Sequence, residues 1–181
     1  CATFDSTDDG NIGPIGEALM ETTKTDRVIF CPAFPEYSIT IFQGRMFLGG
    51  TMLGESGKRF DPVTPMTNSN LVEVLQAQCK SKVSLLPHAR LVEGKSACND
   101  YISRQIKDGA NLFIVDAVDN EDVTRIAELT TDWPLTSGAD AIPMFLARTW
   151  LTTGREVNQR SLLPPAPGHE AVIAGSCAVN T

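Results

Sequence analysis

The segment Leu112-Phe-Ile-Val115 predicts a strand that is buried on both faces, because four apolar residues follow one another without polar alternation. Asp116 stands where this strand should end. Acidic residues then precede apolar residues at helical spacing, and negative charge is favoured at the N-terminal end of a helix. The stretch is therefore typical of one strand–helix unit of an α/β fold.

The same alternation of strand and helix patterns continues on both sides of this unit. Short apolar runs predict further strands over residues 27–31, 83–86 and 135–138. Helical spacing predicts helices over residues 12–20, 69–79, 96–109, 123–129 and 141–150. Ser69 is the expected N-cap of the second of these helices. Because such connections favour right-handed crossovers, we predict a three-layer, Rossmann-like α/β fold with a largely parallel sheet.

The region between Ile39 and Leu53 departs from the alternation of strands and helices. Its short β-type runs are separated by Gln43-Gly44 and Gly49-Gly50, and glycine in such turns is typical of hairpins. We therefore predict a small antiparallel β insertion. We expect this insertion to form one wall of a ligand cleft.

The chain divides into parts of different composition. Residues 155–170 are rich in proline and lack an apolar period, which predicts a linker, so residues 1–154 are expected to form one domain. Residues 171–181 open with an apolar run and predict the first strand of another domain. Since the chain also begins with Cys1 rather than Met, we expect it to be truncated at both ends.

The composition argues against several classes of protein. The net charge is −7 and the only adjacent basic pair is Lys58-Arg59, whereas a nucleic-acid-binding protein usually carries a basic stripe. No apolar run approaches the roughly 18 residues of a membrane span. The five cysteines and two histidines lack ligand spacing, which argues against a metal site and indicates reduced thiols in the cytoplasm.

Polar residues precede the first predicted helix, and they are candidates for binding an anion. They are Asp5, Ser6, Thr7 and Asn11. A helix N-terminus offers free N–H groups to a carboxylate or phosphate, and Asp5 could accept hydrogen bonds from sugar hydroxyls. The alternative is that one of these side chains only caps the helix.

Further candidates lie in the loop after the first strand and in the polar region after the insertion. Phe34 stands between two prolines that stiffen the backbone, although it could equally pack in the core. Lys58 and Arg59 are the cations best placed for an anionic ligand, although such side chains are often only solvated.

A last group of candidates stands at the predicted ends of strands. Asp116, Ser137 and Gly138 belong to this group, and open α/β sheets bind ligands at the carboxyl ends of their strands. We expect these candidates to converge with Asn11 and Lys58 in one crevice.

Several stretches carry a family resemblance along nearly the whole chain. They are Thr3-Phe-Asp-Ser6, Gly10-Asn-Ile-Gly-Pro14, Cys31-Pro-Ala-Phe-Pro-Glu36, Pro65-Met-Thr-Asn-Ser-Asn-Leu-Val72, Val115-Asp-Ala117 and Ala171-Val-Ile-Ala-Gly-Ser-Cys177. Together they resemble the four-carbon acid sugar kinases, most closely the 3-oxo-tetronate kinase branch. Members of that family combine an N-terminal domain that binds the sugar acid with a C-terminal domain that binds ATP.

The resemblance implies a function for the parent protein. It implies phosphorylation of a four-carbon acid sugar, of the 3-oxo-tetronate or threonate type, with ATP and Mg²⁺ as cofactors. Gly175 and Ser176 would then fall in the opening strand of the ATP-binding domain and contact the nucleotide. The resemblance also implies that the chain lacks the leading strand of the family and nearly all of the ATP-binding domain. We therefore expect the isolated chain to lack kinase activity and to bind neither cofactor tightly.

Departures from the family pattern leave a second interpretation open. Tyr37-Ser38-Ile39 stands where the family commonly has Asn-Gly-Arg, and Asp140 stands where a small apolar residue is expected. The alternative is a non-catalytic or degenerate member that acts only as a binding or interaction module. In the kinase interpretation the partner is a small anionic sugar acid, and neither nucleic acid nor membrane is expected. Exposed apolar surface is expected to favour a homo-oligomer.

Overall fold

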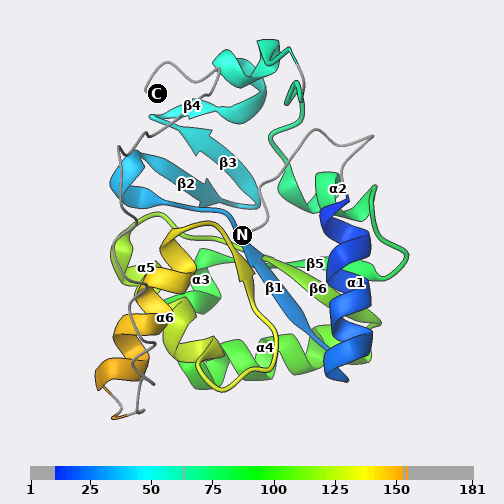
Figure 1. The fold of residues 1–181 in the computed structure, drawn as a ribbon, viewed down its shortest axis with the longest axis vertical. Coiled ribbons are helices and arrows are strands. Elements are labelled where there is room, and N and C mark those ends of the chain that lie inside the picture. The colour runs from blue at the N-terminus through cyan, green and yellow to red at the C-terminus, as the bar shows by residue number, and fades with distance from the viewer. Residues whose placement is uncertain (1–10, 63, 153, 155–181) are drawn as a thin grey trace, which may run out of the picture.

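The structure, a computed structural model, describes residues 11–62, 64–152 and 154 (Figure 1). It confirms the predicted α/β class, with a parallel four-stranded sheet and a separate antiparallel three-stranded sheet. Within the described residues, no helix has the length and apolar character needed to cross a membrane. The predicted linker and the strand after it lie outside these residues.

The main sheet has the strand order β5-β6-β1-β7. Its strands are β1 (Val28–Cys31), β5 (Lys82–Leu86), β6 (Ala110–Val115) and β7 (Ser137–Gly138). β1 pairs with β6 on one side and, through Phe30 and Cys31, with β7 on the other. All residues of β1 are buried, as an unbroken apolar run predicts.

Helices cover both faces of this sheet. They are α1 (Ile12–Thr23), α2 (Leu71–Gln76), α3 (His88–Leu91), α4 (Lys95–Lys107), α5 (Asn120–Thr130) and α6 (Ala141–Thr152). The chain steps from β1 past β6 to β5 through α2, and it steps back through α4 and α5. Because crossovers are right-handed, helices that connect strands in one direction along the sheet lie on one face, and helices that connect them in the other direction lie on the opposite face. The layers are therefore α1 with α2, and α4 with α5 and α6 (Figure 1).

The predicted antiparallel insertion is confirmed. It consists of β2 (Ile39–Phe42), β3 (Arg45–Leu48) and β4 (Thr51–Met52) in that order. Ile41 joins it to the main sheet, because its N–H donates to the carbonyl oxygen of Ala117 at 2.9 Å and its carbonyl oxygen accepts at 3.0 Å. Ala117 comes two residues after the end of β6, so the insertion is fixed at the carboxyl ends of the parallel strands.

The predicted cap of α2 is wrong. The Asn70 side chain, not Ser69, accepts the hydrogen bond from the N–H of Val72, at 3.2 Å. Ser69 Oγ instead accepts from the N–H of Gly54 at 2.8 Å, so it ties the insertion to the next loop. No pattern predicts α3, because four residues are too few for a helical period to appear.

Candidate functional site

A cavity of about 330 Å³, here called the carboxyl-edge cavity, lies where β1 and β7 end. Pro32 and Phe34 line it after β1, and Ala139 and Asp140 line it after β7. The insertion and the loop that follows it supply the remaining lining residues, which are Ile39, Met46, Leu48, Leu53, Lys58, Thr64 and Met66. As expected, the insertion forms one wall of a cleft.

The backbone holds Phe34 at the wall of this cavity. Its N–H donates to the carbonyl oxygen of Ile39 at 2.8 Å, and its carbonyl oxygen accepts from the N–H of Ile39 at 3.1 Å. The ring centroids of Phe34 and Tyr37 lie 4.6 Å apart. The residues that follow Phe34 form a 3₁₀ helix over Pro35–Tyr37, which brings the Tyr37 ring back to Phe34. The half-buried ring of Phe34 therefore gives the cavity a fixed aromatic surface.

Two charged side chains line the carboxyl-edge cavity. Lys58 lies in a 3₁₀ helix whose N-cap, Ser56, accepts a hydrogen bond from the N–H of Lys58 at 3.2 Å. Its Nζ lies 3.6 Å from Oδ2 of Asp61, and its side chain is 41% exposed. Asp140 is exposed and precedes α6. An anionic ligand at Lys58 would therefore replace or share the contact with Asp61.

Asp116 has a different environment from the one predicted. Its side chain is completely buried, and it accepts hydrogen bonds from the backbone N–H groups of Gln43 at 3.0 Å, Gly44 at 2.9 Å and His88 at 3.0 Å. It is not among the residues that line the carboxyl-edge cavity. The carboxylate ties the first turn of the insertion and the start of α3 to the end of β6.

A second buried carboxylate, Asp122, reinforces this edge. Its Oδ2 lies 3.1 Å from Nδ1 of His88 and accepts from the N–H of Val118 at 3.0 Å, and its Oδ1 accepts from Nη1 of Arg125 at 3.0 Å. The sequence indicates Asp122 only as an acid at a helix start. Its contacts with α3 could not be predicted, because no pattern predicts that helix.

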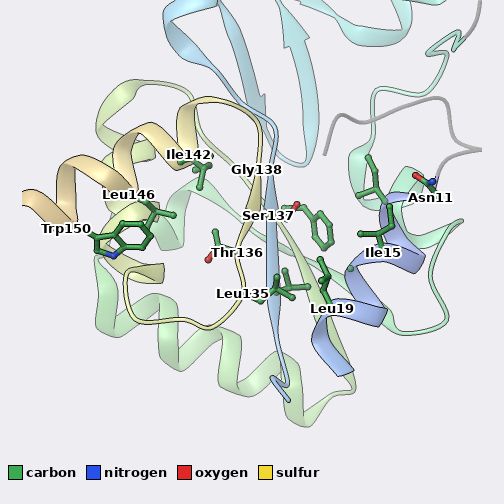
Figure 2. Close-up of a pocket in the computed structure, with 15 residues that line it drawn as sticks. Asn11, Ile15, Leu19, Leu135, Thr136, Ser137, Gly138, Ile142, Leu146 and Trp150 are labelled. Carbon is green, nitrogen blue, oxygen red and sulfur yellow. The ribbon is translucent and has the colours of Figure 1, made fainter. Parts of the chain in front are cut away.

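A larger hollow of about 500 Å³ runs along the free edge of β7, and it is here called the edge groove. Asn11, Ser137 and Gly138 line it, together with residues of α1 and α6 that lie on its two sides (Figure 2). The described lining residues include no charged side chain. The edge groove is therefore suited to apolar groups rather than to a sugar acid.

The structure places the described members of the predicted site in different parts of the fold rather than in one crevice. Phe34 and Lys58 line the carboxyl-edge cavity, whereas Asn11, Ser137 and Gly138 line the edge groove. Arg59 is exposed and lines neither hollow. Asp5, Ser6, Thr7, Gly175 and Ser176 lie outside the described residues. Sequence reasoning missed Thr64. It noted Met66 only within a family-like stretch, and Asp140 only as a departure from a family pattern.

Cys31 directly precedes Pro32, which lines the cavity, and its thiol is not a nucleophile. Burial raises the pKa of the Cys31 thiol to about 12; a hydrogen bond with the backbone of Ala33 lowers it, and the charges of Asp116 and Asp122 raise it further. A thiol needs its thiolate form to react, so Cys31 stays inert at neutral pH. Across residues 11–62, 64–152 and 154, no group of three or more His, Cys, Asp or Glu side chains could hold a metal ion.

Sequence comparisons point to one family. The model described as "Sugar-binding N-terminal domain" matches residues 1–146. A 3-oxo-tetronate kinase of Cupriavidus necator is 40% identical over 98% of this chain, and one of Haemophilus influenzae is 35% identical over 100% of it. The chain spans 42% and 43% of the lengths of these relatives.

Solved structures agree with this result. A Haemophilus influenzae protein with 34% identity has a TM-score of 0.80 over 92% of this chain and 40% of its own. A domain of unknown function from Bordetella bronchiseptica, a domain-swapped dimer with bound citrate, has 27% identity and a TM-score of 0.61 over 81% of this chain and 35% of its own. Since the family model covers most of its 181 residues, the chain belongs to the family of sugar-binding N-terminal domains.

Proposed function

We propose that the carboxyl-edge cavity binds a small sugar acid as the acceptor site of an ATP-dependent kinase. The substrate would be a four-carbon acid sugar of the 3-oxo-tetronate or threonate type. One observation carries the proposal: Lys58 lines a cavity at the carboxyl ends of parallel strands, where open α/β sheets bind ligands. The family match and the names of the kinase relatives support it.

The lining residues suit the parts of such a ligand. The ammonium group of Lys58 would attract the carboxylate, and the hydroxyl of Thr64 and the carboxylate of Asp140 would hydrogen-bond to sugar hydroxyls. Phe34 and the other apolar walls would exclude water from the bound acid. The cavity volume of about 330 Å³ lies at the lower end of the range for small-molecule sites.

ATP and Mg²⁺ are implied by the kinase relatives, but the described residues offer no closed set of metal ligands. They form no group of three or more acidic, cysteine or histidine side chains for a metal, and no reaction step is derived through either cofactor. The parent protein would hold both mainly in the part that this chain does not span, and Gly175 and Ser176 of this chain would contact the nucleotide next to it. We therefore expect no kinase activity from the isolated chain.

A non-catalytic binding module remains the second candidate, and the position of Asp140 favours it. This carboxylate lines the same cavity as Lys58, so it would repel an acid that binds too close to it. The Asp140→Asn variant separates the two candidates. If the acid binds with its carboxylate at Lys58 and its hydroxyls at Asp140, the variant should bind it no more tightly. A marked gain in affinity would support the module.

The remaining features of the parent protein are also proposals. The dimeric Bordetella bronchiseptica relative supports the expected homo-oligomer. The cytoplasmic location and the absence of nucleic-acid and membrane partners stay predictions.

Calorimetric titration of the chain with threonate and erythronate tests the proposal. Lys58→Ala should weaken binding of the acids about tenfold, because it removes one charge-assisted hydrogen bond worth about 1.5 kcal/mol. Lys107→Ala, at an exposed position in the last turn of α4, is the matched control and should change nothing. Erythritol, a neutral polyol, should bind both variants equally. Absence of heat with every four-carbon acid, or an equal loss for erythritol, contradicts the proposal.

A further inference from the structure

Several of the residues that line the carboxyl-edge cavity follow the insertion closely in sequence, and Lys58 organises their backbone. They include Lys58, Thr64 and Met66. The carbonyl oxygen of Lys58 accepts from the N–H of Asp61 at 3.2 Å and from the N–H of Met66 at 3.0 Å. These two hydrogen bonds fix Lys58 relative to the buried Met66.

Asp61 does not line the cavity, but its carboxylate contacts two residues that do. Its Oδ1 accepts from the N–H of Thr64 at 2.9 Å, and its Oδ2 lies 3.6 Å from Nζ of Lys58. The Asp61 side chain is only 11% exposed, whereas that of Lys58 is 41% exposed and has a flexible four-carbon stem. The carboxylate is therefore the fixed partner of this ion pair, and the ammonium group is the adjustable one.

The geometry of the pair leaves the ammonium group of Lys58 able to bind a ligand. Its distance of 3.6 Å from Asp61 exceeds the roughly 2.7–2.9 Å of a charge-assisted hydrogen bond. An ammonium group has three N–H donors, so it can turn toward a ligand carboxylate without losing a strong bond. The carboxylate of Asp61 would remain beside this ligand, however, and like charges repel. Two carboxylates would then share one cation.

We propose that Asp61 is a positioning residue that lowers the affinity of the carboxyl-edge cavity for anions, because it competes with the ligand carboxylate for Lys58. This inference rests on the proposed function, in which Lys58 binds the acid. Asp61 offsets part of the attraction between Lys58 and any anion. The cavity then selects its ligand less by charge and more by the hydroxyl groups that reach Thr64 and Asp140, which both line it.

Calorimetric titration of an Asp61→Asn variant with threonate and erythritol tests the proposal. Asparagine keeps an oxygen that can accept from the N–H of Thr64, but it removes the charge. Threonate should bind about threefold more tightly than to the unchanged chain, because a partly exposed ion pair no longer competes with it. Erythritol, which is neutral, should bind equally to both.

Asp26→Asn is the matched control for the change in net charge. Asp26 forms an ion pair with Arg27 at 2.8 Å, and neither residue lines the carboxyl-edge cavity. This variant should bind threonate and erythritol as the unchanged chain does. A gain for threonate equal to that of Asp61→Asn would assign the effect to overall charge and overturn the proposal.

The Lys58→Ala background shows whether Asp61 acts through Lys58. Asp61→Asn should give little or no gain for threonate in this background, because the cation that the two carboxylates share is absent. The difference between the gains in the two backgrounds measures the coupling of Asp61 and Lys58. A gain of the same size in both backgrounds would mean that Asp61 repels the acid directly, and it would overturn the proposal.

The remaining outcomes separate this proposal from the proposed function. If threonate binds the unchanged chain but binds Asp61→Asn equally or more weakly, only the role of Asp61 is overturned. If threonate gives no heat with any of these chains, the proposed function fails and the role of Asp61 fails with it. If Asp61→Asn does not fold, the carbon-13 NMR signal of the Asp61 carboxyl group in the unchanged chain replaces the variant. Threonate should shift this signal and erythritol should not, and the absence of a shift with bound threonate overturns the proposal.

Discussion

The edge groove and the carboxyl-edge cavity differ in size and in charge, and the smaller of the two contains the charged side chains. The edge groove is larger, at about 500 Å³, but none of its described lining residues is charged. The carboxyl-edge cavity has about 330 Å³ and contains Lys58 and Asp140. Helices and strands form the groove, whereas loops and the insertion form most of the cavity. The comparison teaches that the charge of the lining residues, rather than the volume, decides which hollow suits a small anionic ligand.

The walls of the two hollows are also anchored differently. Asp116, completely buried, fixes the insertion to β6 and thereby one wall of the carboxyl-edge cavity. Glu17, partly exposed on α1, fixes one wall of the edge groove, because its Oε1 accepts from the N–H groups of Lys80 at 2.9 Å and Ser81 at 2.7 Å. A buried anchor should contribute more to stability than a solvated one, so the comparison can be tested by removing each.

Removal of Asp116 should give the largest effect. Asp116→Ala leaves the N–H groups of Gln43, Gly44 and His88 without their acceptor, and should lower the free energy of unfolding by about 3 kcal/mol. Asp116→Asn keeps one acceptor oxygen and should cost less. Urea denaturation measures both, with Asp100→Ala at an exposed position of α4 as the control. An Asp116→Ala variant as stable as the control contradicts the role of Asp116 as an anchor.

A change at the boundary of the two hollows should give an intermediate effect. Gly138 lines the groove and the next residue, Ala139, lines the cavity. A methyl group at Gly138 would lie 2.5 Å from Cγ1 of Ile142 and 3.1 Å from the carbonyl oxygen of Cys31. Gly138→Ala should therefore lower the free energy of unfolding by about 2 kcal/mol through overpacking.

Gly57→Ala is the control for this change, because no atom of the described residues, apart from its chain neighbours, lies within 4 Å of the position of its added methyl group. Thermal unfolding of both variants compares them directly. If the Gly138→Ala variant unfolds at the same temperature as the Gly57→Ala variant, β7 and α6 are not packed as tightly as the structure indicates.

The sequence predicts the buried strands well, because burial on both faces leaves an unbroken apolar run such as Leu112–Val115. It predicts the insertion for a similar local reason, since Gln43 and Gly44 adopt φ values of 52° and 71° in its first turn. Neither pattern contains the pairing order of the strands. That order depends on contacts between segments far apart in the chain, and it decides where the edge groove lies.

The candidate site is predicted only in part for the same reason. Lys58 and Phe34 line the same cavity, as a cation after the insertion and a rigid loop after a strand suggested, but their role in binding a ligand stays a prediction. Asp116 stands at a strand end, as expected, but the backbone groups that it binds come from a turn and a helix far away in sequence. Asn11 and Lys58 line different hollows, and no local pattern could have separated them.

Loss of the Glu17 anchor should give the smallest effect, and one that depends on pH. Burial raises the pKa of the Glu17 carboxyl, but hydrogen bonds from Ser81 and Lys80 outweigh it, so the pKa lies below its ordinary value of 4.5. A carboxyl with a lower pKa in the folded state stabilises the fold above its unfolded pKa, and this contribution is lost as the pH falls through the folded value.

Glu17→Gln should therefore lower the free energy of unfolding by less than about 1 kcal/mol at pH 7, because the carboxylate is partly solvated. The difference from the unchanged chain should shrink as the pH falls below 4.5. Urea denaturation at pH 7 and at the lowest pH at which the chain stays folded measures this difference. Glu21→Gln, at an exposed position of the same helix, is the control. A difference that grows toward low pH would mean that folding raises the pKa of the Glu17 carboxyl, and it would contradict the role of the carboxylate as an anchor of α1.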